Sequence, residues 1–202
     1  WGKDPKRQPN LNDPDPSYHG MVWTEFAKAV GPIAYIVRAR FVGLRDIGAA
    51  LSPQSAFNII QGLETVSLRM EKHCSNAAKV AEYLSSHNKV SRVIYAGLDE
   101  GEAGERANKY LKGGHGALCG IELKGGKASG EKFINNLNMF YHVANIGDAR
   151  SLAIHPASTT HSQLSDEEME SAGVTPSYVR LSIGIEHIDD IIEDLKNALD
   201  SA

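Results

Sequence analysis

Apolar residues recur at three- and four-residue intervals over residues 56–84, the spacing that predicts an amphipathic helix. Ser52 is a suitable N-cap for this helix, and Pro53 follows at the first helical position, where proline is tolerated. The pattern predicts one long helix from Ser52 to Leu84. Its apolar positions are Ala56, Ile59, Ile60, Leu63, Met70, Cys74, Ala77, Ala81 and Leu84.

The same spacing predicts three shorter helices later in the chain. Ser165 and Glu168 have the spacing of a capping box, and Gly173 suits the end of that helix. A last helix begins near Asp189 and Asp190, whose charges favour the positive end of a helix. The apolar faces of the other two helices are Phe133, Ile134 and Leu137 in the first, and Ile188, Ile191, Ile192, Leu195 and Leu199 in the last.

Short runs with the composition of strands lie between these helices. They cover residues 93–95, 117–123, 139–143, 152–154 and 178–185. Strands and helices do not alternate as regular βαβ units, so the pattern predicts an α+β layer. Helices would then cover one face of a largely antiparallel sheet.

The first twenty residues have a different character, because four prolines stand among Asn and Asp. Proline disfavours regular structure, so we expect an extended or looping surface segment. A compact domain seldom begins with so long a connection. We therefore expect the chain to be a truncated or incomplete part of a larger protein.

Composition limits the kinds of partner. The chain has 202 residues, 42% of them hydrophobic, and a net charge of -4, with its basic residues dispersed. This favours small molecules or proteins over nucleic acid or a membrane surface, and no apolar run is long enough to span a bilayer. Cys74 and Cys119 lack the spacing of a metal or redox site and are interpreted as two buried thiols. The expected location is the cytoplasm.

Arg180 stands inside an otherwise apolar, alternating strand at residues 178–186. A buried cation is costly unless it meets an anion, so something negative is expected opposite Arg180. A guanidinium makes two parallel hydrogen bonds to a carboxylate, which makes an amino-acid ligand a natural candidate. An internal salt bridge to Asp or Glu is the alternative, and strand context alone favours it.

Residues 145–161 concentrate hydroxyl and imidazole groups around Pro156 in a loop that can line a polar pocket. His155 and His161 lack acidic or thiol neighbours at ligand spacing, so a metal site is not expected. Ser151 lacks the glycine-flanked elbow of a nucleophilic serine.

Lys112 precedes Gly113 and Gly114, but the glycines of a phosphate loop come before the lysine. A Schiff-base lysine needs a desolvated pocket, whereas Lys112 is expected at the end of a surface helix, in a turn.

Several longer stretches resemble the Cys/Met-metabolism family of enzymes that depend on pyridoxal 5'-phosphate (PLP). The matching order and spacing run from about residue 18 to the end of the chain. The opening at 16–20 and the variant at 145–148 look most like O-acetylhomoserine sulfhydrylases within that family. The stretches are LRDIG (44–48), SP (52–53), QGLET (61–65), LRM (68–70), His73, NA (76–77), the 151–161 loop and the Arg180 strand.

The resemblance implies the α/β fold of PLP-dependent transferases (fold type I), of which this chain is mainly the C-terminal α+β domain. Residues 1–60 would be the tail end of the large PLP-binding domain with a linker. Residues 61–202 would be the small domain, which begins in a long helix. The implied oligomer is a homotetramer, and the implied partner is the amino-terminal half of the same enzyme.

The implied reaction is γ-replacement, in which O-acetylhomoserine and sulfide give homocysteine and acetate. The resemblance assigns Arg180 to the substrate carboxylate, Ser151 to a place near the cofactor lysine and substrate, and Thr160 to the pocket lining. The lysine that binds PLP covalently belongs to a segment upstream of Trp1, so this chain holds no catalytic residue, and its cofactor-binding residues are unknown.

Two alternatives remain open on the sequence. Cystathionine γ-synthases and lyases, O-succinylhomoserine sulfhydrylases and methionine γ-lyases are related activities, and the motifs of Arg180 and Ser151 do not choose between them. The chain could also be a noncatalytic scaffold or binding module, in which Arg180 pairs internally or binds a carboxylate.

Overall fold

The computed structural model describes residues 1–202, which divide into two compact units, Trp1–Ile60 and Gln61–Ala202. The division falls within helix α5 (Pro53–Glu64). The assignment of these units to the end of a large cofactor domain and to a small domain stays a prediction.

The amino-terminal unit consists of short helices around a small core of its own. Its buried apolar residues are Leu11, Trp23, Ala27, Ala34 and Val37. The elements are η1 (Pro5–Arg7), α1 (Pro9–Asn12), η2 (Pro16–Tyr18), α2 (Trp23–Ala27), α3 (Ala34–Arg38), the π-helical η3 (Ala39–Leu44) and α4 (Arg45–Ile47).

Residues 1–20 lie at the surface as expected, since only Leu11 and Asp15 are buried, but the expectation of extended or looping structure is wrong. Proline is favoured at the first position of a helix, and Pro5, Pro9 and Pro16 each begin a short helical turn there. The segment also contributes buried groups. Asp15 accepts hydrogen bonds from the Ser17 backbone N–H (3.0 Å) and the Trp23 indole (2.8 Å), and the Ser17 and Trp23 contacts lower its pKa to about 2.

The predicted long helix is interrupted once. Ser52 caps its start as expected, since its Oγ accepts the Ser55 N–H at 3.1 Å. Helix α5 then ends at Glu64, and Thr65 has φ -113° and ψ 5° before α6 (Val66–Ser85) begins. Arg69 bridges the break because its Nη2 donates to the carbonyl of Gly62, in the last turn of α5, at 2.6 Å. Apolar periodicity continues across the break, so the sequence pattern does not reveal it.

The carboxyl-terminal unit contains one five-stranded sheet in the order β1-β2-β5-β4-β3. All neighbours pair antiparallel except β3 and β4, which are parallel, so the predicted largely antiparallel sheet is confirmed. The strands are β1 (Val90–Ile94), β2 (Leu118–Leu123), β3 (Tyr141–His142), β4 (Leu152–Ile154) and β5 (Tyr178–Ser182).

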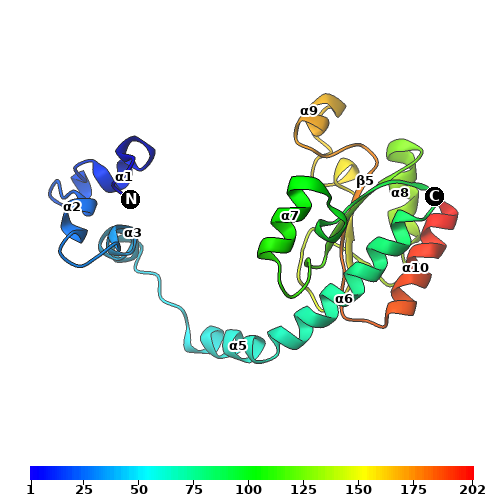
Figure 1. Ribbon diagram of the computed structural model, residues 1–202, viewed down its shortest axis with the longest axis horizontal. Helices are drawn as coiled ribbons and strands as arrows, with labels where there is room; N and C mark the ends of the chain where they lie inside the picture. Colours follow the sequence, from blue (N-terminus) through cyan, green and yellow to red (C-terminus); the bar gives the residue numbers. More distant parts are fainter. The chain divides into compact units, whose positions relative to one another are not determined.

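Helices cover one face of this sheet, as expected. Helix α6 packs on β1 and β2, α8 (Gly126–Asn136) packs on β2 and β5, and α10 (Ile188–Ser201) lies against both helices, as Figure 1 shows for α6 and α10. The strands bury alternate residues against them, among them Cys119, Ile121, Val179 and Leu181. The remaining elements are η4 (Ala96–Leu98), α7 (Gly101–Tyr110), η5 (Pro156–Ser158) and α9 (Asp166–Ser171).

The local signals for α9 and α10 are also confirmed. Ser165 and Glu168 form the reciprocal capping box, and Gly173 has φ 76° just after α9. Asp189 and Asp190 occupy the first turn of α10. These features depend on residues close in sequence, which is why sequence alone finds them.

Helix α6 holds the chain that follows β5 through two buried polar side chains. His73 Nδ1 donates to the Ile183 carbonyl at 2.6 Å. Asn76, one helical turn later, donates to the carbonyls of Gly184 (3.0 Å) and Glu186 (2.9 Å). Because a buried carbonyl without a partner is costly, these bonds fix residues 183–186 to the helix.

We expect Asn76→Ala to lower the free energy of unfolding by ~2–3 kcal/mol, because it leaves the buried Gly184 carbonyl and the partly buried Glu186 carbonyl without the Asn76 donor. Urea denaturation followed by circular dichroism measures this loss. The matched control is Ser75→Ala, next to Asn76 on the exposed side of α6. Equal unfolding midpoints for the two variants would contradict the role given to Asn76.

Candidate functional site

Arg180 lies on the face of β5 opposite the helix-covered core. Its cross-strand neighbours are Gly120 on β2 and Ile154 on β4, neither of which carries charge. Arg180 is half-buried as a residue, but its guanidinium is at an exposed position, where Nη2 donates one hydrogen bond to the Asn145 carbonyl at 3.1 Å and no ion pair forms. The internal salt bridge considered from the sequence is therefore not formed, and most of the five guanidinium donors remain for a ligand.

The surroundings of Arg180 include the Tyr178 phenol and the Glu122 carboxylate, and the Tyr178 ring packs closely on the Gly120 backbone. Tyr178 lies across Gly120, where an added Cβ would come within 2.5 Å of the Tyr178 ring. Burial raises the pKa of the Tyr178 phenol, and the positive charge of Arg180 opposes that rise. The acid on this face, Glu122, pairs with Arg92 at 3.7 Å. Arg180 is thus the cation here without an acidic partner.

The predicted substrate residue Ser151 is fully buried at the start of β4. Its hydroxyl donates to Glu186 Oε2 (2.9 Å) and accepts the Gly184 N–H (2.9 Å). Its backbone N–H donates to Glu186 Oε1 at 2.6 Å. The structure therefore engages the Ser151 hydroxyl with Glu186 and Gly184, and the assignment of Ser151 to a place near the cofactor lysine and substrate stays a prediction.

The loop at residues 143–150 is exposed along its length but is bonded to β5 and the residues after it. The Asn145 carbonyl accepts from Arg180, and the Gly147 N–H donates to Ser182 Oγ at 3.2 Å. The Ile185 N–H donates to the Ala149 carbonyl at 2.9 Å. The loop thus lies beside Arg180, and its carbonyl sets the direction of the guanidinium.

Thr160 is exposed in the loop after η5, and its Oγ1 is 2.9 Å from His161 Nδ1. No hydrogen bond joins it to Arg180 or Ser151. Its assignment to a pocket lining stays a prediction. No group of three or more His, Cys, Asp or Glu is arranged to hold a metal ion.

His155 is a structural residue. It is fully buried, its Nε2–H donates to the Pro176 carbonyl (2.9 Å), and its Nδ1 accepts from Ser158 Oγ (2.8 Å). The imidazole lies against Gly130 of α8, where a Cβ would come within 2.4 Å of it. Desolvation lowers the pKa of His155 below its usual 6.5.

Lys112 is exposed just after α7, and its Nζ donates to the Asn108 carbonyl at 2.9 Å, which caps that helix. Of the two cysteines, Cys119 is buried, and burial raises its pKa to about 12. Cys74 is half-buried, which corrects the interpretation of two buried thiols, because the 113–116 loop covers only part of it. Gly114 closes against Cys74, where an added Cβ would come within 2.7 Å.

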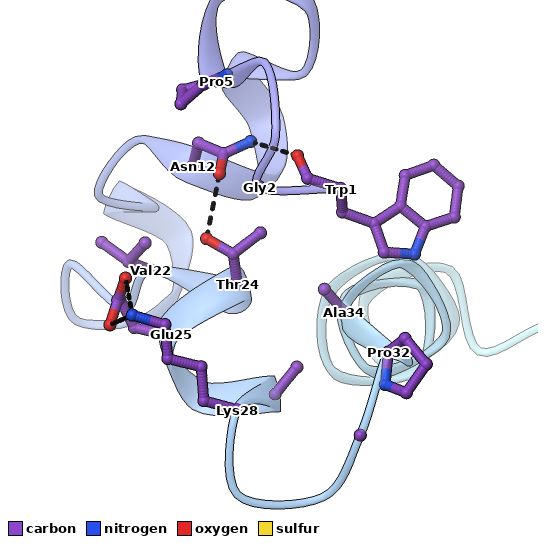
Figure 2. A pocket seen from close by; sticks show the side chains of 12 residues that line it. Trp1, Gly2, Pro5, Asn12, Val22, Thr24, Glu25, Lys28, Pro32 and Ala34 are labelled. Carbon is purple, nitrogen blue, oxygen red and sulfur yellow. Dashed lines mark hydrogen bonds and ion pairs between the residues drawn. The ribbon is translucent and has the colours of Figure 1, made fainter.

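A hollow of about 510 Å³ lies in the amino-terminal unit, away from the predicted site residues in sequence. Figure 2 shows Asn12 between the Trp1 carbonyl and Thr24, and Glu25 paired with Lys28. These polar groups bond to one another, and none is a nucleophile or metal-ligand cluster.

Comparison with protein families identifies the family of this chain. The model of the Cys/Met metabolism PLP-dependent enzymes matches residues 18–200. The chain belongs to this family. Its relatives include the O-acetyl-L-homoserine sulfhydrylase of Leptospira meyeri, 51% identical over 98% of this chain and 46% of that protein. The homocysteine synthase of Schizosaccharomyces pombe is 48% identical over 100% of this chain and 46% of that protein. The L-methionine gamma-lyase of Fusobacterium nucleatum is 47% identical over 80% of this chain and 41% of that protein.

A solved structure shares the fold. The protein of Campylobacter jejuni described as an O-acetylhomoserine (thiol)-lyase has a TM-score of 0.82 and 44% identity, over 98% of this chain and 46% of that one. It contains N'-pyridoxyl-lysine-5'-monophosphate. The predicted α/β fold of PLP-dependent enzymes is thereby confirmed. The chain spans about half the length of the relatives that it matches.

The residues present do not fit covalent attachment of PLP. A lysine that forms a Schiff base is activated in a desolvated pocket. Eleven of the twelve lysines here are exposed, and the half-buried one, Lys89, donates to the Asp200 and Ala202 carbonyls. The family depends on PLP, and the assignment of Arg180 to a substrate carboxylate stays a prediction. No helix is long and apolar enough to cross a membrane.

Sequence reasoning assigned no role to Glu186, nor to His73 and Asn76, although the last two stand among the stretches that resemble the family. A signal for Glu186 was present, because a carboxylate follows Gly184 closely at the end of an apolar strand. His73 and Asn76 carry the spacing of one helix face. Their partners, however, are more than 100 residues away, and no local pattern predicts such contacts.

We expect the stability of the carboxyl-terminal unit to fall as pH is lowered from about 7 to about 5.5, because the unfolded chain binds a proton at His155 more readily than the folded one. Stability from this group is present above 6.5, the usual pKa, and is lost below it. Urea denaturation at both pH values measures the effect. His155→Gln should show a smaller fall than the unaltered chain, and an equal fall would contradict the role of His155.

Proposed function

We propose that this chain forms the carboxyl-terminal part of an O-acetylhomoserine sulfhydrylase, in which Arg180 binds the α-carboxylate of the amino-acid substrate. The single observation that carries the proposal is that Arg180, a half-buried residue of β5, presents a guanidinium with no acidic partner within the chain. The names of the relatives with 51% and 48% identity support the activity. The reaction would convert O-acetylhomoserine and sulfide to homocysteine and acetate.

The roles of this chain in that reaction are binding and orientation. Arg180 would hold the carboxylate through paired hydrogen bonds, which fixes the bonds to be broken relative to the cofactor. Ser151 would support the neighbouring loop from behind, and Thr160 would line the pocket. PLP, held by a lysine outside this chain, would supply the electron sink for proton loss and departure of acetate.

The partners follow from the same proposal. The amino-terminal half of the enzyme would complete the active site, and the resemblance to the family supports a homotetramer. The cytoplasm is the proposed location, and the two unpaired cysteines support a reducing compartment. Determining the mass and amino-terminal sequence of the isolated protein tests the first point. A mass equal to 202 residues, with no companion chain and no PLP absorbance near ~420 nm, would overturn it.

L-Methionine γ-elimination is the second candidate, and the 47% identity to an L-methionine gamma-lyase favours it. The two activities are separated by one comparison. The enzyme is supplied with O-acetylhomoserine and sulfide, with O-succinylhomoserine and sulfide, with cystathionine, and with methionine alone. We expect homocysteine from the first mixture at the highest kcat/KM, whereas faster release of methanethiol from methionine would select the lyase.

We expect Arg180→Lys to raise the KM for O-acetylhomoserine ~10- to 100-fold, because a lysine cannot form the two parallel hydrogen bonds of a guanidinium. Steady-state kinetics of homocysteine formation measures the change. The matched control is Arg92→Lys, an exposed arginine on β1. A wild-type KM in Arg180→Lys, or an equal rise in the control, would contradict carboxylate binding by Arg180.

A further inference from the structure

Both carboxylate oxygens of Glu186 accept hydrogen bonds from Ser151. Oε1 accepts the Ser151 N–H at 2.6 Å, and Oε2 accepts the Ser151 hydroxyl at 2.9 Å. The same hydroxyl accepts the Gly184 N–H at 2.9 Å. Ionised acceptors make stronger hydrogen bonds than neutral ones, so this clamp, defined by Glu186, Ser151 and Gly184, is a strong contact between the two chain segments.

The clamp needs a glycine at its base. A Cβ on Gly184 would come within 2.2 Å of Glu186 Oε2 and 2.5 Å of the Ala149 carbonyl. The carboxylate therefore packs directly against the Gly184 backbone. Any residue other than glycine at position 184 would place its Cβ in the space that the carboxylate occupies. On the helix side, Asn76 holds the Glu186 carbonyl at 2.9 Å, which fixes the segment from which the Glu186 side chain extends.

A continuous series of bonds leads from this clamp to Arg180. Ser151 ends the exposed loop at residues 143–150. The loop is then bonded at Ala149 to Ile185, at Gly147 to Ser182 Oγ, and at Asn145 to Arg180 Nη2. The Glu186 carboxylate fixes one end of the loop, and the Arg180 guanidinium contacts the other.

We propose that Glu186 is a positioning residue that holds the 143–150 loop, and through the Asn145 carbonyl the Arg180 guanidinium, in the geometry that binds the substrate carboxylate. This rests on the proposed function, because it assigns a support to the same site. Glu186 acts through Ser151 and does not touch the substrate. Loss of the clamp lets the loop move and turns the guanidinium away from the carboxylate.

A graded series of variants in the complete enzyme tests this. Glu186→Ala removes both acceptors and should raise the KM for the amino-acid substrate ~10-fold. Glu186→Gln keeps one acceptor oxygen for the Ser151 N–H and should raise it less. The KM for sulfide should stay unchanged throughout. Glu193→Gln, on the exposed side of α10, is the matched control and should behave as the unaltered enzyme.

Hydrogen–deuterium exchange supplies a readout that does not depend on the reaction. The peptide covering residues 143–151 should exchange faster in Glu186→Ala than in the unaltered enzyme, and Ser151→Ala should show the same change if Glu186→Ala does not fold. Faster exchange with an unchanged KM for the amino acid would overturn the proposal, and so would unchanged exchange. A rise in both KM values together would indicate a general structural loss and would also overturn it.

Failure of the proposed function gives a different result. If the unaltered enzyme makes no homocysteine from O-acetylhomoserine, the assigned activity is wrong. The KM comparison is then made with the amino acid that the enzyme does accept, and the exchange experiment is unaffected. The clamp is therefore tested in either case.

Discussion

The hydrogen bonding of residues 183–186 is the constraint on which the carboxyl-terminal unit depends. This segment follows β5 and contacts α6 through His73 and Asn76, and its first two residues, Ile183 and Gly184, are buried. His73 and Asn76 donate hydrogen bonds to three of its carbonyls, and the Ser151 hydroxyl accepts the Gly184 N–H. Because buried polar groups must be paired, the placements of α6, β4 and β5 are coupled at this point.

The face of the sheet that the helices do not cover carries a charged group without an internal partner of opposite charge. There the half-buried Arg180 is a charge that the chain itself does not neutralise, whereas Arg92 and Glu122 pair with each other. A polypeptide of 202 residues with 25 acidic side chains could readily have supplied a partner. That the chain supplies only the Asn145 carbonyl to Arg180 supports the proposal that this guanidinium binds a ligand. Ser151, in contrast, has both of its hydroxyl functions satisfied internally.

Local signals explain why much of the fold could be predicted. The Ser52 cap, the capping box of Ser165 and Glu168, and the strand at 152–154 each depend on neighbours within a few residues. The misses are also local in origin. Proline in residues 1–20 was interpreted as a breaker although it begins helical turns, and the break at Thr65 interrupts a periodicity that continues on both sides.

The sequence by itself determined the alternation of helices and strands, the family, and Arg180 as a cation within an apolar strand, because these follow from residue type and spacing. Only the tertiary structure decided what each polar side chain meets. It showed that Arg180 has no internal anion, that Ser151 faces Glu186, and that α6 binds the end of β5. The contacts of Ser151 and of α6 join residues 35–110 positions apart, and they depend on three-dimensional packing that no local pattern encodes.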